Sequence, residues 1–260
     1  MPAAVVTGSS RGIGRAIAHR FARDGYDVAV NYHTSEAAAE AVADEVRERG
    51  QEAVVVGADV SDADDARRLV DRTVEAFDGV AHVVNNAGID QHVFTDDLSP
   101  ADFDHVMDVN VNGAFNVTKA ALPHLRASAD AGSDSDSDSN SNSNSEAAGP
   151  AVTNVSSILA YTGAPVECHY AASKGALLSL TRSHAADFAP DVRVNAVAPG
   201  HVETDMTADR SPAEEREELA AIPLERFGRP DEIADAVAYL RDAAFVTGET
   251  LNVNGGELMR

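Results

Sequence analysis

Short apolar runs recur along the chain, separated by longer stretches in which apolar residues follow a helical spacing. Short runs bounded by glycine, proline or polar residues are typical of β-strands. The predicted strands are residues 3–7, 28–32, 52–56, 82–84, 151–155, 193–198 and 250–253. Because helical stretches alternate with these strands, we expect a parallel sheet of about seven strands with helices on both faces, a doubly wound α/β fold.

Several of the predicted helices have recognisable ends. The first closes at Gly25, the second covers 35–49 and closes at Gly50, and Ser61 is expected to begin the third with Asp64 in a capping-box position. The remaining helices are predicted at 99–126, 168–188, 212–221 and 230–240. The helix at 212–221 lies inside a polar segment, 201–227, that we expect to act as a lid.

A glycine-rich segment, TGSSRGIG, stands between the first strand and the first helix. Gly8 permits a tight turn, Gly12 lets the backbone approach a pyrophosphate, and Gly14 lets the helix pack closely. The amide groups at the start of the helix then face an anion. This context favours dinucleotide binding over an ordinary glycine-rich loop.

Four residues lie at or just beyond the carboxyl ends of the first four predicted strands. Gly8, Asn31, Asp59 and Asn86 occupy these positions. In doubly wound sheets, ligands bind outside the carboxyl ends of the strands, so we expect these residues to line one site.

Tyr170 and Lys174 lie four residues apart in the sequence YAASK, which places them on one face of the helix predicted at 168–188. A phenol titrates near pH ~10, and a neighbouring ammonium is expected to lower its pKa towards neutrality. The pair therefore predicts acid–base chemistry at this position, although a chance pair on a solvated helix face is the alternative.

Residues 128–149 read SADAGSDSDSDSNSNSNSEAAG and contain no large apolar side chain. Such a composition cannot bury enough surface to offset the entropy of ordering, so a disordered surface insert is predicted within one domain that spans 1–260. A calcium site built from the alternating aspartates is the alternative.

The charge balance is extreme, with 43 acidic and 20 basic residues and a net charge of −23. Such a field repels nucleic acid and anionic membranes, so we expect neither as a partner. Because only two of the basic residues are lysines, we hypothesise a salt-rich cytoplasm, as in a halophile.

The single cysteine, Cys168, excludes an internal disulfide and is expected to be a small buried hydrophobe. We expect no metal site, and without a signal peptide or a long apolar run we expect a cytoplasmic protein.

Taken in order, these motifs resemble the short-chain dehydrogenase/reductase family, whose fold is of the Rossmann type. TGSSRGIG, NNAG at 85–88, Ser157 thirteen residues before Tyr170, YAASK and the Pro199-Gly200…Thr204 segment all match the family pattern. TLNVNGG near the end is most similar to the 3-oxoacyl-acyl-carrier-protein reductase group, although sugar dehydrogenases of the family share much of it.

The resemblance implies catalytic roles for four residues. Tyr170 would be the proton donor or acceptor, Ser157 would stabilise the oxygen of the reacting carbonyl, and Lys174 would lower the pKa of the tyrosine and bind ribose. The backbone of Asn110 would hold a water in a proton relay. The remaining cofactor contacts implied are Gly8, Ser10, Arg11, Gly12, Ile13, Gly14, Asn31, Asp59 at the adenine, Val60, Asn86, Ala87, Gly88, Pro199, Gly200, Val202 and Thr204.

The residues at the end of the second strand bear on the choice of cofactor. An NAD site usually offers a carboxylate there, whereas this chain has Asn31-Tyr32-His33, with Arg11 in the glycine turn. An arginine can bind a 2′-phosphate, so NADP is favoured over NAD. The expected function is reduction of a 3-oxoacyl thioester or related ketone; a sugar or polyol dehydrogenase and a non-catalytic NADP-binding regulator are the alternatives. The resemblance also implies a homotetramer.

Overall fold

The computed structural model describes residues 1–135, 148–204 and 211–259. Its strands form one parallel sheet in the order β3-β2-β1-β4-β5-β6-β7, so the chain winds outwards from β1 first in one direction and then in the other. The strands are β1 Ala3–Val6, β2 Asp27–Tyr32, β3 Ala53–Gly57, β4 His82–Asn85, β5 Ala151–Val155, β6 Arg193–Pro199 and β7 Thr250–Val253. The predicted seven-stranded, doubly wound sheet is confirmed.

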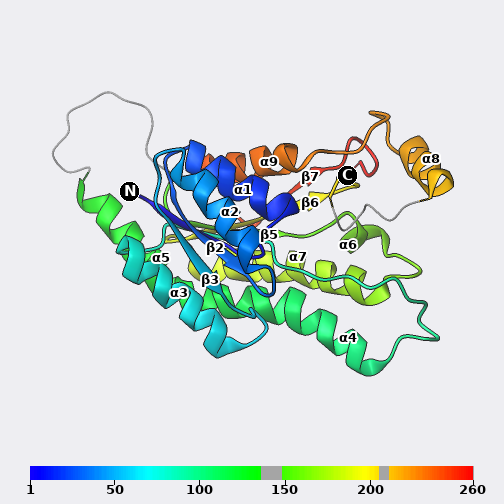
Figure 1. The fold of residues 1–260 in the computed structure, drawn as a ribbon, viewed down its shortest axis with the longest axis horizontal. Coiled ribbons are helices and arrows are strands. Elements are labelled where there is room, and N and C mark those ends of the chain that lie inside the picture. Colours follow the sequence, from blue (N-terminus) through cyan, green and yellow to red (C-terminus); the bar gives the residue numbers. More distant parts are fainter. Residues whose placement is uncertain (136–147, 205–210, 260) are drawn as a thin grey trace.

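Helices connect successive strands and cover both faces of the sheet (Figure 1). They are α1 Gly12–Arg23, α2 Glu36–Arg47, α3 Ala63–Phe77, α4 Pro100–Met107, the π-helix η1 Asp108–Asn112, α5 Gly113–Ser135, α6 Leu159–Thr162, α7 Cys168–Phe188, α8 Pro212–Ala221 and α9 Pro230–Asp242. The part of the chain that the structure describes contains no helix that is long and apolar enough to cross a membrane.

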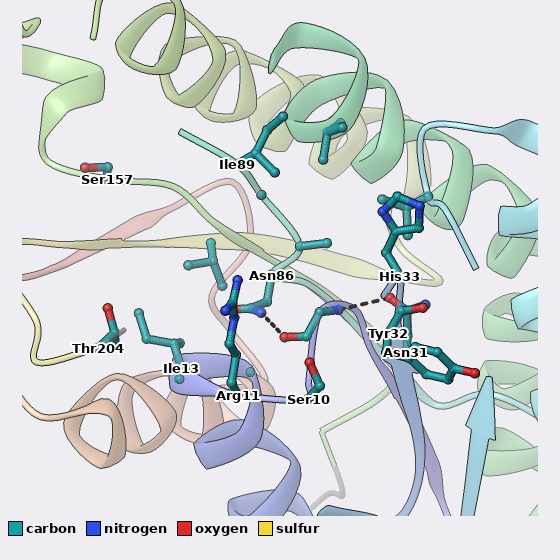
Figure 2. Close-up of a pocket in the computed structure, with 18 of the residues that line it drawn as sticks. Ser10, Arg11, Ile13, Asn31, Tyr32, His33, Asn86, Ile89, Ser157 and Thr204 are labelled. Atoms are coloured by element: carbon teal, nitrogen blue, oxygen red, sulfur yellow. Dashed lines mark hydrogen bonds between the residues drawn. The ribbon is translucent and has the colours of Figure 1, made fainter. Parts of the chain in front are cut away.

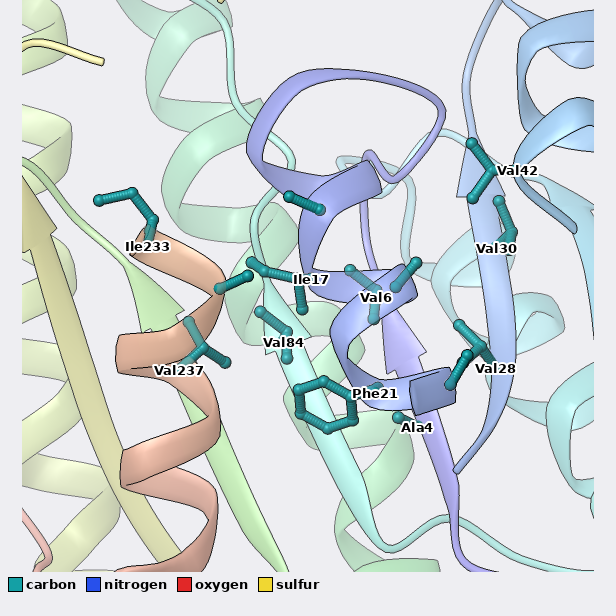
Figure 3. Packing of buried hydrophobic residues seen from close by; sticks show 14 of the residues in the cluster. Ala4, Val6, Ile17, Phe21, Val28, Val30, Val42, Val84, Ile233 and Val237 are labelled. Carbon is teal, nitrogen blue, oxygen red and sulfur yellow. The ribbon is translucent and has the colours of Figure 1, made fainter. Parts of the chain in front are cut away.

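Two apolar layers hold the helices against the sheet. On one face, Ile17 and Phe21 of α1 pack with Val237 of α9 over β1, β2 and β4 (Figure 3). On the other face, α3, α5 and α7 bury apolar side chains that include Leu69 and Leu125. Because both faces are covered, the central strands β1, β4 and β5 are buried along their whole length, and most of their residues are apolar.

The start of α3 differs from the sequence prediction. Asp62, and not Ser61, is the N-cap, and its carboxylate accepts hydrogen bonds of 2.9 Å from the amides of Asp64 and Asp65. The Ser61 hydroxyl instead donates to Asp59 Oδ1 at 2.7 Å. Asp64 therefore does not form the expected capping box.

The helix before the serine-rich insert is also longer than expected, because α5 continues to Ser135 instead of ending near Arg126. Alanines favour the helical conformation here, and the Ser128 hydroxyl donates to the Val80 carbonyl at 3.0 Å. Residues 136–147 lie outside the described residues, and with them most of the predicted insert. The middle of the expected lid, 205–210, lies outside them as well, whereas α8 begins and ends as predicted.

Candidate active site

The carboxyl ends of the strands open into a pocket of about 390 Å³. Every residue predicted for the site lines this pocket except Asn110, which is buried next to it and hydrogen-bonds Ser173. Ser157 and His33 lie at opposite ends of it (Figure 2). The site is therefore elongated, with the glycine turn between the two ends.

The glycine turn is shaped by close backbone contacts. A Cβ atom at Gly14 would lie 2.4 Å from the Gly8 carbonyl oxygen and 2.5 Å from Asn86 Nδ2, closer than atoms can approach. Gly8 and Gly12 have positive φ angles of 60° and 55°. Only glycine adopts this turn without strain. The tight turn and the close packing that the sequence predicts at Gly8 and Gly14 therefore depend on the absence of side chains there.

The first turn of α1 suits an anion. Arg11 is the N-cap residue, its side chain makes no capping hydrogen bond, and the first turn contains no acidic residue. The amides at this helix end are therefore available to phosphate, and the helix dipole favours negative charge there. A dinucleotide fits this cradle.

Two asparagines brace the turn from either side (Figure 2). Asn31 Oδ1 accepts a hydrogen bond from the Gly8 amide at 3.0 Å, and its Nδ2 donates to carbonyls of β3 and the residues after it. Asn86 Nδ2 donates to the carbonyls of Thr7 and Gly8 at 2.9 and 3.1 Å. Although Asn31 lines the pocket, its side chain is engaged with the protein backbone, so it positions the turn.

The far end of the pocket, beyond the turn, carries Asp59 and His33. Asp59 Oδ1 accepts hydrogen bonds from the amide and hydroxyl of Ser61, while its Oδ2 lies 3.9 Å from His33 Nε2. Tyr32 and His33, which the sequence analysis connected with the choice of cofactor, line this end of the pocket. Thr34 and Ser35 line it as well, although sequence reasoning did not place them in the site. Thr34 and Ser35 could have been predicted from their position just after β2, because that strand ends beside the glycine turn.

Tyr170 and Lys174 lie on one face of α7, as their spacing predicts, with the Lys174 nitrogen 5.3 Å from the centre of the Tyr170 ring. Lys174 is 4% exposed, and its ammonium donates to the Val155 carbonyl at 2.9 Å. Ser157, two residues after Val155, hydrogen-bonds Tyr170. The end of β5 and one face of α7 thus bring the three predicted catalytic side chains together.

The pKa of Tyr170 is raised and not lowered, contrary to the expectation from its lysine neighbour. Burial is the largest cause, the negative charges of Asp90 and Glu167 add to it, and the hydrogen bond with Ser157 opposes it. Burial also lowers the pKa of Lys174 to about 8, against the opposing effect of Asp90. At neutral pH the phenol is therefore protonated and the ammonium is mostly charged, which is the combination that donates a proton.

Asn110 is buried within the π-helix η1. Its Oδ1 accepts a hydrogen bond from the Ile89 amide at 2.8 Å, and its Nδ2 donates to the Ile89 carbonyl and to Ser173 Oγ. Ser173 Oγ in turn donates to the Tyr170 carbonyl. The Asn110 side chain thus ties the loop after β4 to the helix that carries Tyr170. π-Helical turns are frequent at functional sites.

The class of protein follows from three features taken together. The sheet is doubly wound, a glycine turn lies at its topological switch point, and a tyrosine–lysine pair lies beside a serine. This combination is typical of a nucleotide-dependent dehydrogenase. The short chain dehydrogenase family profile matches residues 2–215, and the chain belongs to that family of oxidoreductases. It is 37% identical over 98% of both chains to a 3-oxoacyl-[acyl-carrier-protein] reductase of Staphylococcus aureus.

Solved structures agree with this assignment. The fold matches a glucose/ribitol dehydrogenase of the family from Brucella melitensis with a TM-score of 0.87 and 36% identity, over 100% of this chain and 97% of the other. It also matches a short chain dehydrogenase from Burkholderia cenocepacia, solved in complex with NADP, with a TM-score of 0.86 and 34% identity over 98% and 97% of the two chains.

Proposed function

We propose that this protein is an NADP-dependent oxidoreductase that reduces a 3-oxoacyl thioester or a related ketone to a secondary alcohol. The observation that carries the proposal is the convergence of Tyr170, Ser157 and Lys174 at one end of a pocket whose middle is lined by the glycine turn. Similarity to the S. aureus reductase supports the substrate class. Homotetramer formation stays a prediction.

In the proposed reaction, residues of the glycine turn would hold the dinucleotide cofactor, which when bound would supply a hydride for the carbonyl carbon. Tyr170 donates its phenolic proton to the carbonyl oxygen, which gains negative charge as the hydride arrives. Ser157 hydrogen-bonds the same oxygen, and Lys174 stabilises the phenolate left behind through its positive charge. The side chain of Asn110 holds α7 and the loop after β4 in a fixed relative position through its hydrogen bonds. We propose that its backbone holds a water that returns a proton to the tyrosine.

Replacing Tyr170 tests the chemistry directly. Tyr170→Phe removes the proton donor and keeps the ring, so kcat should fall by about 10²–10⁴-fold while the Kd for NADPH stays close to that of the wild type. Stopped-flow or steady-state NADPH oxidation measures the first quantity and fluorescence titration the second. Tyr239→Phe, at an exposed position on α9, is the matched control.

Two outcomes would overturn the proposal. Full activity in Tyr170→Phe would remove the tyrosine from the mechanism. A wild-type protein that binds NADPH but oxidises it with no ketone, thioester or sugar would instead fit the regulator alternative.

The preference for NADP rests on the end of the pocket at β2. No carboxylate directly follows that strand, where His33 is the next residue, and Arg11 lines the same pocket from the glycine turn. We expect kcat/KM for NADPH to exceed that for NADH. Arg11→Ala should reduce the NADPH value about 10–100-fold with little effect on NADH, since a charged contact to phosphate contributes roughly 1.5–3 kcal/mol. Equal values for the two cofactors in the wild type would contradict the preference.

A sugar or polyol is the second candidate substrate, because acidic side chains approach the catalytic tyrosine. The charges of Asp90 and Glu167 act on Tyr170, and carboxylates accept hydrogen bonds from hydroxyl groups. The relative from B. melitensis carries the name glucose/ribitol dehydrogenase. A panel of acyl thioesters, simple ketones and sugars with both cofactors, run at high salt, separates the two candidates by kcat/KM.

A further inference from the structure

Three metal-ligating side chains meet beside the catalytic end of the pocket. Asp90 and His92 lie in the loop between β4 and α4, and Glu167 precedes α7. One ligand atom from each lies within 4.8 Å of the other two, and no other such group of three occurs in residues 1–135, 148–204 and 211–259. None of the three transfers the proton or the hydride in the proposed reaction, although the charges of Asp90 and Glu167 act on Tyr170.

The distances suit a metal with nitrogen and oxygen ligands. His92 Nε2 lies 3.3 Å from Asp90 Oδ2 and 2.8 Å from Glu167 Oε1. Ligand atoms bound tetrahedrally about 2.0–2.1 Å from Zn²⁺ are roughly 3.3 Å from one another. A cation bound to His92 Nε2 in place of its proton would therefore lie within reach of both carboxylates after a modest rearrangement of the side chains.

Each carboxylate is oriented towards the histidine. Asp90 Oδ1 accepts a hydrogen bond from the Gln91 amide at 2.7 Å, which leaves Oδ2 for His92. Glu167 occupies the N-cap position of α7, yet its side chain makes no capping hydrogen bond and turns to His92 instead.

The two segments that carry the ligands are fastened to each other. The Val93 amide donates to the Val166 carbonyl at 2.7 Å, and these residues directly follow His92 and precede Glu167. Thr95 Oγ1 also lies 3.5 Å from the sulfur of Cys168. A ligand set held in place before binding loses less entropy when the metal arrives.

The charge of the cluster favours a cation. The Asp90 and Glu167 side chains are only 11% and 13% exposed, and neither pairs with a lysine or arginine in the described part of the chain. The 71% exposed side chain of His92 leaves an approach from solvent.

We propose that Asp90, His92 and Glu167 bind a first-row divalent cation such as Zn²⁺, with water completing the coordination. One imidazole and two carboxylates select Zn²⁺, Mn²⁺ or Co²⁺ over Mg²⁺, which prefers oxygen ligands alone. Since Asp90 and Glu167 both act on the charge state of Tyr170, a bound cation would also reduce the negative field at the catalytic phenol.

Metal binding is tested without turnover, so the result is independent of the proposed function. Untagged, chelator-treated full-length protein is titrated with Zn²⁺ by calorimetry at pH 7.5, and with Co²⁺ by visible absorption. We expect one equivalent per chain, no competition from equimolar Mg²⁺, and weaker binding at pH 5.5, because protons compete for the imidazole and carboxylates.

Variants locate the site. His92→Ala and Glu167→Gln should each weaken Zn²⁺ binding by more than about 10–100-fold, the range seen for groups that only support a ligand. His19→Ala, which removes the histidine of a His19–Glu45 pair on α1 and α2, is the matched control and should bind as the wild type does. Circular dichroism checks that each variant is folded.

The proposal is overturned if the wild type binds no Zn²⁺ at micromolar concentrations. It is equally overturned if folded His92→Ala and Glu167→Gln retain wild-type affinity, because the cation would then be bound elsewhere.

Discussion

At the scale of single residues, Gly14 shows that the glycine turn has no space for a side chain at this position. The added Cβ in Gly14→Ala would press on the Gly8 carbonyl within the turn and on Asn86, whose side chain braces the turn. We expect the Kd for NADPH to rise at least about 10-fold and the free energy of unfolding to fall by roughly 1–3 kcal/mol, as for other overpacked sites.

Gly175→Ala in α7 is the control, because its Cβ would meet only the Ala160 carbonyl at an ordinary 3.6 Å and alanine favours the helix. Fluorescence titration and urea denaturation measure both effects. Wild-type cofactor affinity in Gly14→Ala would show that the turn can relax.

At the scale of elements, the start of α3 depends on one side chain. Asp62→Ala removes both hydrogen bonds to the first turn and should lower the free energy of unfolding by about 1 kcal/mol, the usual contribution of an N-cap. Ser61 is the residue that the sequence favoured as the N-cap. Ser61→Ala should lower the free energy of unfolding by less than Asp62→Ala does, since the Ser61 hydroxyl hydrogen-bonds Asp59 and not the helix. Urea denaturation compares the two, and the reverse order would restore Ser61 as the cap.

The break between α4 and α5 is a second feature of element scale. A continuous helix from Ser99 was predicted, yet residues 108–112 form a π-helical turn, in which Asn110 bonds Ile89 and Ser173. No local sequence pattern distinguishes this turn from α-helix, because the partners of Asn110 come from distant segments.

At the scale of the whole molecule, the net charge of −23 should make stability depend on salt. Self-repulsion opposes the compact state, and raising KCl from 0.1 to 3 M shortens the Debye length from ~10 Å to below ~3 Å. Relief of about 2 kcal/mol would raise Tm by roughly 4–8 °C. Differential scanning fluorimetry with sucrose as a non-ionic control measures this, and a Tm that rises with sucrose but not with KCl would contradict the salt hypothesis.

The sequence by itself determined the local features of this protein. Strand and helix positions, the glycine turn and the shared face of Tyr170 and Lys174 follow from periodicity, backbone freedom and helical spacing, all of which operate between near neighbours. The carboxyl ends of the parallel strands then gathered Gly8, Asn31, Asp59 and Asn86 at one edge, as expected.

Only the tertiary structure decided the properties that depend on burial and on distant contacts. Burial raised the pKa of Tyr170 where the lysine alone predicted a decrease, because desolvation depends on every segment that packs around the phenol. Asn31 turned out to brace the glycine turn, and a loop hydrogen bond brought His92 to Glu167. Such effects arise between residues far apart in the chain, so no local pattern encodes them.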